Sequence, residues 1–461
     1  MYIMPFYNGN IESLYSYVLE NFRDQKSNGV YSNLKKDSIG FFGHVKFMEA
    51  QVFLYKATGQ QKYLDDLRLS LDFCMKHRRE NGINNFWDAE FTCDSNWIES
   101  NHLGILAYCT YEYWQFSGDA RFNQMVVQLM ESIPNANKTQ GAFIDGYDNK
   151  GMNLDDRQYL ADNSEILLGW WACFKITGNE VFKHRYEQLA AFMEENFKTV
   201  EHQPLHAAWL VGPRHVKYGE GSLEYCDTSH TTYEQFFISR DIMLMDIKNH
   251  RERIVNATDW IKAYALFEDG FAGYNETDDK MIGWTAYFAA QAYWAYGISG
   301  DNSYYKDAIN AVNAVVGLQN TEDGSIIPII PVKRKINWSE LDDACEGLGT
   351  IWQLCSFLQG LATIEGLKTS PVSFSKQSTG PSKVMYAQFD EERGNGSIKI
   401  RLSGTRTEEE YRLKIYDARK YVIYSNLKEY VEITEKDGGF HIKVKDMDGD
   451  LELIIERVRV I

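Results

Sequence analysis

A short pattern recurs along the first three quarters of this chain and limits the folds that the chain can adopt. In each copy an apolar stretch ends in Thr or Ser, a Gly and a polar residue follow, and an aromatic residue stands four positions after the Gly. The glycines are Gly59, Gly118, Gly178 and Gly300, which lie 59, 60 and 122 residues apart. A fixed period of about 60 residues is typical of a repeat architecture, with one copy lacking its motif near residue 239.

Each copy of the pattern predicts a helical hairpin. Gly adopts the left-handed conformation that ends a helix, and the polar residue beside it starts the next one. A connection of two or three residues makes the second helix antiparallel to the first. The expected outer helices span 9–24, 61–78, 119–133, 179–197, 249–266 and 301–318, and the expected inner helices span 40–58, 99–117, 157–177, 228–247, 281–299 and 339–365.

The inner helices decide the fold class. They are apolar nearly all round, so they must be buried. Six buried helices surrounded by six amphipathic ones predict a mainly α fold, an (α/α)6 toroid over residues 1–368, with an open solenoid as the alternative. After Pro371 the apolar residues alternate with a period of two, which predicts a small antiparallel β-sheet or sandwich domain over residues 369–461.

Long connections precede most of the inner helices, whereas the turns that follow the inner helices are tight. Long loops inside a compact domain are usually functional. In a closed ring these loops all emerge on the face where the inner helices begin. We therefore expect the functional site on that face.

Charge and composition narrow the class of partner. The net charge of −17 argues against nucleic acid, because phosphate binding needs a basic surface. The sequence has no leader-like start and no apolar run long enough to span a membrane, which predicts a cytoplasmic protein, although a chain whose leader had been removed would look the same. Seven scattered cysteines without paired spacing predict neither a metal site nor disulfides, and no cofactor is expected. A homo-oligomer is compatible with all of this.

Asp162 and Asn163 open the third inner helix and are the first candidate site residues. The simpler interpretation is that one of them caps the helix. The alternative is that Asp162, at the rim of the ring and ahead of a long apolar helix, serves as a general acid.

A second group opens the preceding inner helix. Glu99, Asn101 and His102 fall within one turn, and Trp97 precedes them. A lone histidine at a helix start is more often structural, but the three polar residues together favour a role in binding or proton transfer. The aromatic ring of Trp97 could flank a sugar.

A third group lies on the longest loop and the helix after it. Arg214 and His230 are candidates to bind a carboxylate-bearing ligand, and Tyr233 is a candidate for proton transfer. An ordinary solvated loop is the alternative. Three further tryptophans stand near the starts of inner helices and could stack on sugar rings: Trp209, Trp284 and Trp338.

The segment from Leu160 to Asn179, which contains Asp162-Asn163 and ends in Thr177-Gly178-Asn179, resembles the unsaturated glucuronyl and rhamnogalacturonyl hydrolases. Those enzymes are six-hairpin toroids. The resemblance implies that Asp162 is the general acid/base and that the substrate is an oligosaccharide containing a 4,5-unsaturated uronic acid. The product of hydration would then fall apart without a glycosyl-enzyme intermediate.

One element departs from that family. Where the hydrolases carry His-Asp-Leu-Gly, this chain reads Asn101-His102-Leu103-Gly104, so the second carboxylate is absent. This element is more similar to toroid polysaccharide lyases, in which Asn neutralises the uronate and His or Tyr moves the proton. Hydrolysis with Asp162 is thus the first expectation, and β-elimination with Asn101 and His102, His230 or Tyr233 is the alternative. A non-catalytic glycan-binding or scaffold toroid is the third.

Overall fold

The structure is a computed structural model of the 461-residue chain. It describes residues 7–80, 82–83, 98–133, 146–147, 153–155, 160–196, 213–216, 223–225, 232–245, 251–273, 279–330, 332, 350–369, 372–376, 383–390, 395–402, 409–415, 421–436, 439–445 and 449–457.

The predicted helices are present, so the expectation of a mainly helical chain with strands at its C-terminal end is confirmed. The outer helices are α1 (Asn8–Phe22), α3 (Gln61–Lys76), α5 (Asn123–Ser132), α7 (Glu180–Asn196), α9 (Arg251–Tyr264) and α11 (Asn302–Val316). The inner helices are α2 (Phe41–Thr58), α4 (Ser100–Ser117), α6 (Leu160–Thr177), α8 (Thr232–Leu244), α10 (Ile282–Ser299) and α13 (Thr350–Thr369).

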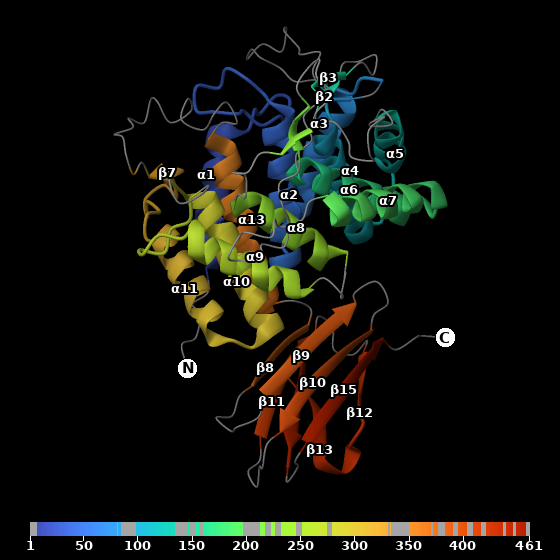
Figure 1. Ribbon diagram of the computed structural model, residues 1–461, viewed down its shortest axis with the longest axis vertical. Coiled ribbons are helices and arrows are strands. Elements are labelled where there is room, and N and C mark those ends of the chain that lie inside the picture. The colour runs from blue at the N-terminus through green and yellow to red at the C-terminus, as the bar shows by residue number, and fades with distance from the viewer. Residues whose placement is uncertain are drawn as a thin grey trace.

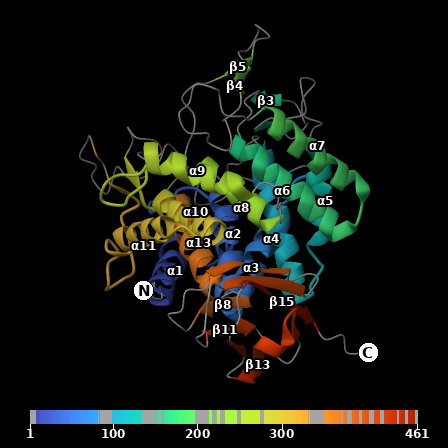
Figure 2. The same cartoon turned by 60° about the horizontal axis from the view of Figure 1, so that its bottom comes forward.

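The inner helices contact one another in a closed cycle. Helix α2 packs on α4, α4 on α6, α6 on α8, α8 on α10, α10 on α13, and α13 returns to α2. Each outer helix packs on the inner helix before it in the chain, except that α1 packs on α13 and so joins the two ends of the ring. Figure 2 shows α7, α9 and α11 outside α6, α8, α10 and α13. An open solenoid would not bring α13 against α2.

The recurring motif builds the tight turns as expected. The four glycines have φ between 65° and 75°, in the left-handed region. The Thr or Ser before each glycine adds a contact that the pattern alone does not reveal. The hydroxyl of Thr177, for example, donates to the carbonyl of Cys173 at 2.7 Å and accepts from the backbone N–H of Asn179 at 3.1 Å. It thereby joins the last turn of one helix to the first residue of the next.

Helices α4 and α6 approach so closely that glycine is required between them. A Cβ added to Gly104 would lie 2.1 Å from the carbonyl oxygen of Glu165, and one added to Gly169 would lie 2.5 Å from the Cα of Gly104. This close approach sets the distance between the first turns of the two helices, where Asn101 and Asp162 stand.

The long connections carry short strands next to the starts of the inner helices. Strand β1 (Ile98–Glu99) leads directly into α4 and pairs with β2 (Gly146–Tyr147), which pairs with β3 (Asn153–Asp155) ahead of α6. Strands β4 (Pro213–Val216) and β5 (Leu223–Tyr225) pair ahead of α8, and β6 (Lys280–Met281) pairs with β7 (Ile329–Ile330) ahead of α10 and α13.

The C-terminal strands form two four-stranded antiparallel sheets, drawn below the helices in Figure 1. One sheet has the order β12 (Tyr421–Ser425), β15 (Gly449–Arg457), β10 (Asn395–Leu402), β9 (Lys383–Asp390), and the other has the order β13 (Val431–Lys436), β14 (Gly439–Val444), β11 (Glu409–Ile415), β8 (Val372–Lys376). Inward-facing residues of both sheets share one apolar core, separate from that of the helices. The clear period-two alternation after Pro371 covers β10, β11, β13, β14 and β15, and it does not single out β8, β9 and β12.

Candidate active site

The first turns of all six inner helices are linked by side-chain contacts. Asn101 of α4 binds Asp162 of α6, and the ring of His102 lies 4.7 Å from that of Phe42 of α2, measured between centroids. Phe42 in turn contacts Trp352 of α13 at 5.2 Å, and Trp352 contacts residues of α8 and α10. The six helices therefore begin on the same side of the ring. We call this side the mouth.

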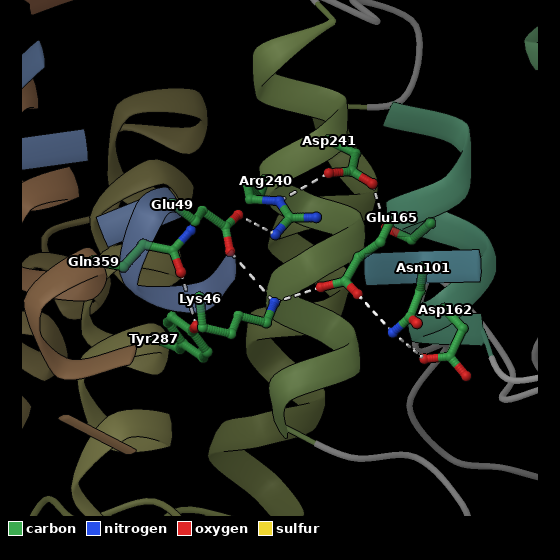
Figure 3. Close-up of polar contacts among 10 residues, drawn as sticks. Lys46, Glu49, Asn101, Asp162, Glu165, Arg240, Asp241, Tyr287 and Gln359 are labelled. Atoms are coloured by element: carbon green, nitrogen blue, oxygen red, sulfur yellow. Dashed lines mark hydrogen bonds and ion pairs between the residues drawn. The ribbon is translucent and has the colours of Figure 1, made fainter. Parts of the chain in front are cut away.

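Asp162 is half-buried, whereas the three residues that follow it, Asn163, Ser164 and Glu165, are buried. The amide nitrogen of Asn101 donates to Asp162 Oδ1 at 3.1 Å and to Glu165 Oε2 at 3.0 Å, as Figure 3 shows. Both N–H bonds of this amide are thus used on carboxylates. Its oxygen Oδ1 is buried and has no hydrogen-bond partner in the described part of the chain, which leaves one acceptor for a water or a ligand hydroxyl.

His102 is buried between aromatic rings. Its imidazole packs against Phe42 and meets Phe41 edge-on at 5.8 Å, and its side chain is 4% exposed. Burial lowers the pKa of His102 well below the usual 6.5, and the nearby cation of Lys46 lowers it further. The imidazole is therefore neutral at pH 7, a state in which it can orient a ligand or accept a proton.

Three aromatic residues complete the mouth on the opposite helices. Tyr233 stacks on Trp284 at 5.7 Å, and both rings meet Trp352 edge-on at 5.7 and 5.8 Å. The sequence pointed to Tyr233 and Trp284 but not to Trp352. Trp284 and Trp352 are only 4% and 6% exposed and Tyr233 is half-buried, so stacking of Trp284 on a sugar stays a prediction.

The structure describes the other predicted site residues only in part. Asn163 is buried in the first turn of α6. Glu99 lies in β1 and Arg214 in β4, and the structure describes their backbone but not their side chains. Four predicted site residues lie outside the described ranges: Trp97, Trp209, His230 and Trp338.

Beneath the mouth lies a group of charged residues that the motifs did not reveal. We call it the buried charge cluster: Lys46 and Glu49 of α2, Glu165 of α6, and Arg240 and Asp241 of α8, each at most 2% exposed. The sequence does contain a signal for this cluster, namely charged residues within helices that are otherwise apolar on all sides. Such a charge must find a partner inside the fold. The partners themselves could not be read from the sequence.

Solved structures with the same arrangement of helices include three enzymes named for their action on sugars. A sugar epimerase from a ruminal bacterium matches with a TM-score of 0.60 at 14% identity, over 77% of this chain and 98% of the epimerase. The cellobiose 2-epimerase of Bacillus thermoamylovorans matches with a TM-score of 0.60 at 12% identity, over 77% of this chain and 99% of the enzyme. A family 76 α-mannanase of Bacteroides thetaiotaomicron matches with a TM-score of 0.57 at 9% identity, over 78% and 96%. This chain shares the fold of these three structures.

At these identities the likeness establishes the fold alone. The three structures named here are two epimerases and a mannanase, so the narrower resemblance to unsaturated uronyl hydrolases stays a prediction. No protein-family model and no curated protein sequence matches the chain. None of the helices in the described ranges has the length and apolar character that a membrane span requires.

Proposed function

We propose that this chain is a carbohydrate-active enzyme whose reaction takes place at the mouth of the ring, with Asp162 as its general acid/base. One observation carries the proposal. The half-buried carboxyl of Asp162 is held by Asn101 at the point where the first turns of the six inner helices meet. A general acid needs such a fixed position, within reach of a ligand and shielded in part from water.

The substrate that we favour is an oligosaccharide containing a uronic acid, with an unsaturated uronate as the first choice. Hydration of an unsaturated uronate needs one group that delivers a proton to the double bond and then accepts one from the attacking water, and a single carboxyl can do both. Six helix N-termini around the mouth favour a negatively charged ligand. Arg214 and His230 remain candidates to bind the uronate carboxylate, and Trp97, Trp209 and Trp338 remain candidates to stack on sugar rings.

Elimination is the weaker alternative. It requires Asn101 to donate to the uronate, but both N–H bonds of Asn101 are already directed at Asp162 and Glu165. The amide would have to release one of these carboxylates, which would leave that carboxylate short of a donor in a largely buried site.

Epimerisation is a second candidate function, because two of the enzymes with this fold are epimerases. Inversion at a carbon needs a base that removes a proton from that carbon. The neutral imidazole of His102, next to Asn101 at the mouth, is such a base. Under this reaction Asp162 would assist by proton transfer to the sugar oxygen.

A single assay separates these reactions. The chain is incubated with an unsaturated uronyl disaccharide, a saturated uronate oligosaccharide and a neutral disaccharide. Loss of the ultraviolet absorbance of the conjugated double bond indicates hydration, and its appearance indicates elimination. Incorporation of solvent deuterium at an inverted carbon, without a change in absorbance, indicates epimerisation.

The role of Asp162 is tested with Asp162→Asn. We expect a loss of about 10²- to 10⁴-fold in kcat, the usual contribution of a general acid. Asp301→Asn is the matched control, because Asp301 is an exposed cap at the start of α11 and Asn caps equally well. Full activity of Asp162→Asn would refute the assignment. Binding of sugars without turnover by any protein in the series would instead identify a glycan-binding toroid.

A further inference from the structure

The buried charge cluster contains two cations and three carboxyls. With all groups ionised it carries one net negative charge, without contact with solvent. Burying ion pairs in a core stabilises a protein little, and apolar residues of similar size often do as well or better. The cluster therefore calls for a role other than stability, and its contacts with the mouth indicate what that role is.

The contacts run across the ring from α2 to α6 and α8, which are not neighbours of α2 in the cycle, as Figure 3 shows. The ammonium of Lys46 donates to Glu165 Oε1 and to Glu49 Oε2, the latter at 3.3 Å. Arg240 donates to Glu49 at 2.5 Å and to Asp241 at 2.9 Å. The ring of Phe237 lies beneath both cations, 4.0 Å from Lys46 Nζ and 4.8 Å from Arg240 Cζ.

The direction of the hydrogen bonds between Lys46 and Asp162 is fixed by charge. An ammonium can only donate, so Glu165 accepts from Lys46 on one oxygen. Its other oxygen faces the amide of Asn101, and a carboxylate accepts there as well. Asn101 must therefore turn its NH₂ group, not its oxygen, toward Glu165.

The orientation of the Asn101 amide determines whether its NH₂ group or its oxygen faces the carboxyl of Asp162. With the NH₂ group turned toward Glu165, its second hydrogen points to Asp162 Oδ1 at 3.1 Å. If the amide were turned over, an oxygen would face both carboxyls and repel them. Burial raises the pKa of Glu165, while the cations of Lys46 and Arg240 oppose that effect and favour the ionised form that this arrangement needs.

We propose that Lys46 and Glu165 are positioning residues for the reaction at the mouth: Glu165, oriented by Lys46, fixes the amide of Asn101 so that Asn101 holds the carboxyl of Asp162. This inference rests on the proposed role of Asp162. It assigns a function to two buried residues that cannot reach a ligand, since each is at most 2% exposed.

The test compares Glu165→Gln with Glu49→Gln. Both substitutions remove one buried carboxylate bound to Lys46, so both are expected to destabilise the fold. Only the glutamine introduced by Glu165→Gln meets Asn101: its NH₂ group must then face either Lys46 or the NH₂ group of Asn101. We expect kcat to fall about 10- to 100-fold in Glu165→Gln with KM nearly unchanged, and to stay within about threefold of wild type in Glu49→Gln. Equal kcat values in the two variants would overturn the inference.

A second variant tests the hydrogen-bond direction. In Lys46→Met/Glu165→Gln the cation is absent, so the NH₂ group of the introduced glutamine can turn toward Glu49 and its oxygen can accept from Asn101. We expect kcat to recover at least about tenfold over Glu165→Gln, because Asn101 can then hold the carboxyl of Asp162 as it does in the wild type. No recovery would contradict the inference.

Asp162→Asn in the same series separates the two claims. If Asp162→Asn is fully active, the proposed function fails. If it is inactive while the Glu165 variants have the same kcat as their control, only the positioning role fails.

Discussion

Replacing Gly104 by alanine tests whether the contact between α4 and α6 sets both the stability of the ring and the geometry of the mouth. The added Cβ would lie 2.1 Å from the carbonyl oxygen of Glu165, 2.7 Å from its carbonyl carbon and 3.0 Å from the Cα of Ile166. All three are backbone atoms of a buried helix, which cannot rotate away as a side chain could.

The expected magnitude follows from these distances. Ordinary non-bonded contacts lie near 3.5 Å, so the two helices must separate by roughly 1 Å. Overpacking of this kind costs about 1–3 kcal/mol, and the upper end applies because backbone faces backbone. Alanine regains about 1 kcal/mol of helix propensity. We expect a net loss of about 2 kcal/mol in the free energy of unfolding.

The assay is urea unfolding followed by far-ultraviolet circular dichroism, with Gly297→Ala as control. Gly297 also lies in an inner helix, α10, but a Cβ there meets nothing within 4 Å. The control should gain about 0.5–1 kcal/mol. Gly104→Ala should also lose activity, because Asn101 stands one turn away and moves with α4. A Gly104→Ala protein as stable as the control would refute the reasoning.

Three further predictions concern charges and caps. Lys46→Met should lower the free energy of unfolding by about 3–5 kcal/mol, since it leaves the buried carboxylate of Glu165 without its cation. Lys62→Met, which removes an exposed pair, should change it by less than about 1 kcal/mol in the same urea assay. Burial raises the pKa of Asp241 from its ordinary 3.8 to about 6, so between these values the folded chain holds a proton that the unfolded chain has released. Wild type should therefore gain on the order of 2 kcal/mol over Asp241→Asn as the pH falls from 7 to 4, measured by unfolding at each pH. Asp301→Ala should cost about 1 kcal/mol, because the side chain accepts from the N–H of Ser303 at the start of α11, and thermal unfolding checks this against Asp301→Asn.

Much of the fold could be predicted because its signals are local. The left-handed glycines, the tight turns and the apolar inner helices each depend on residues that are close together in the sequence. The ends of some helices and three of the C-terminal strands were predicted less well. Helix α8, Thr232–Leu244, lies within the inner helix expected at 228–247, and residues 228–231 and 246–247 lie outside the described ranges. Strands β9 and β12 were missed because runs of consecutive apolar residues, as in 421–424, hide the alternation, and β8 because it has only five residues.

The candidate site was predictable only in part. Asp162, Asn101 and His102 stand at helix starts, and the repeat already indicated that the helix starts share one face. Trp352 carried no separate signal, because a tryptophan in an apolar helix is usually core. Among the described residues, the structure brings Asp162 and Asn101 into contact and places His102, Tyr233 and Trp284 around the same mouth.

The sequence by itself determined the period, the hairpin turns and the apolar character of the inner helices, because each depends on residues close together in the chain. Only the tertiary structure decided which charges meet beneath the mouth. Lys46 binds Glu165 across 119 residues, and Arg240 binds Glu49 across 191. Such pairs form when a closed ring brings helices that are distant in the chain to face one another across its centre. A buried charge is then stable only where an oppositely charged group lies within reach.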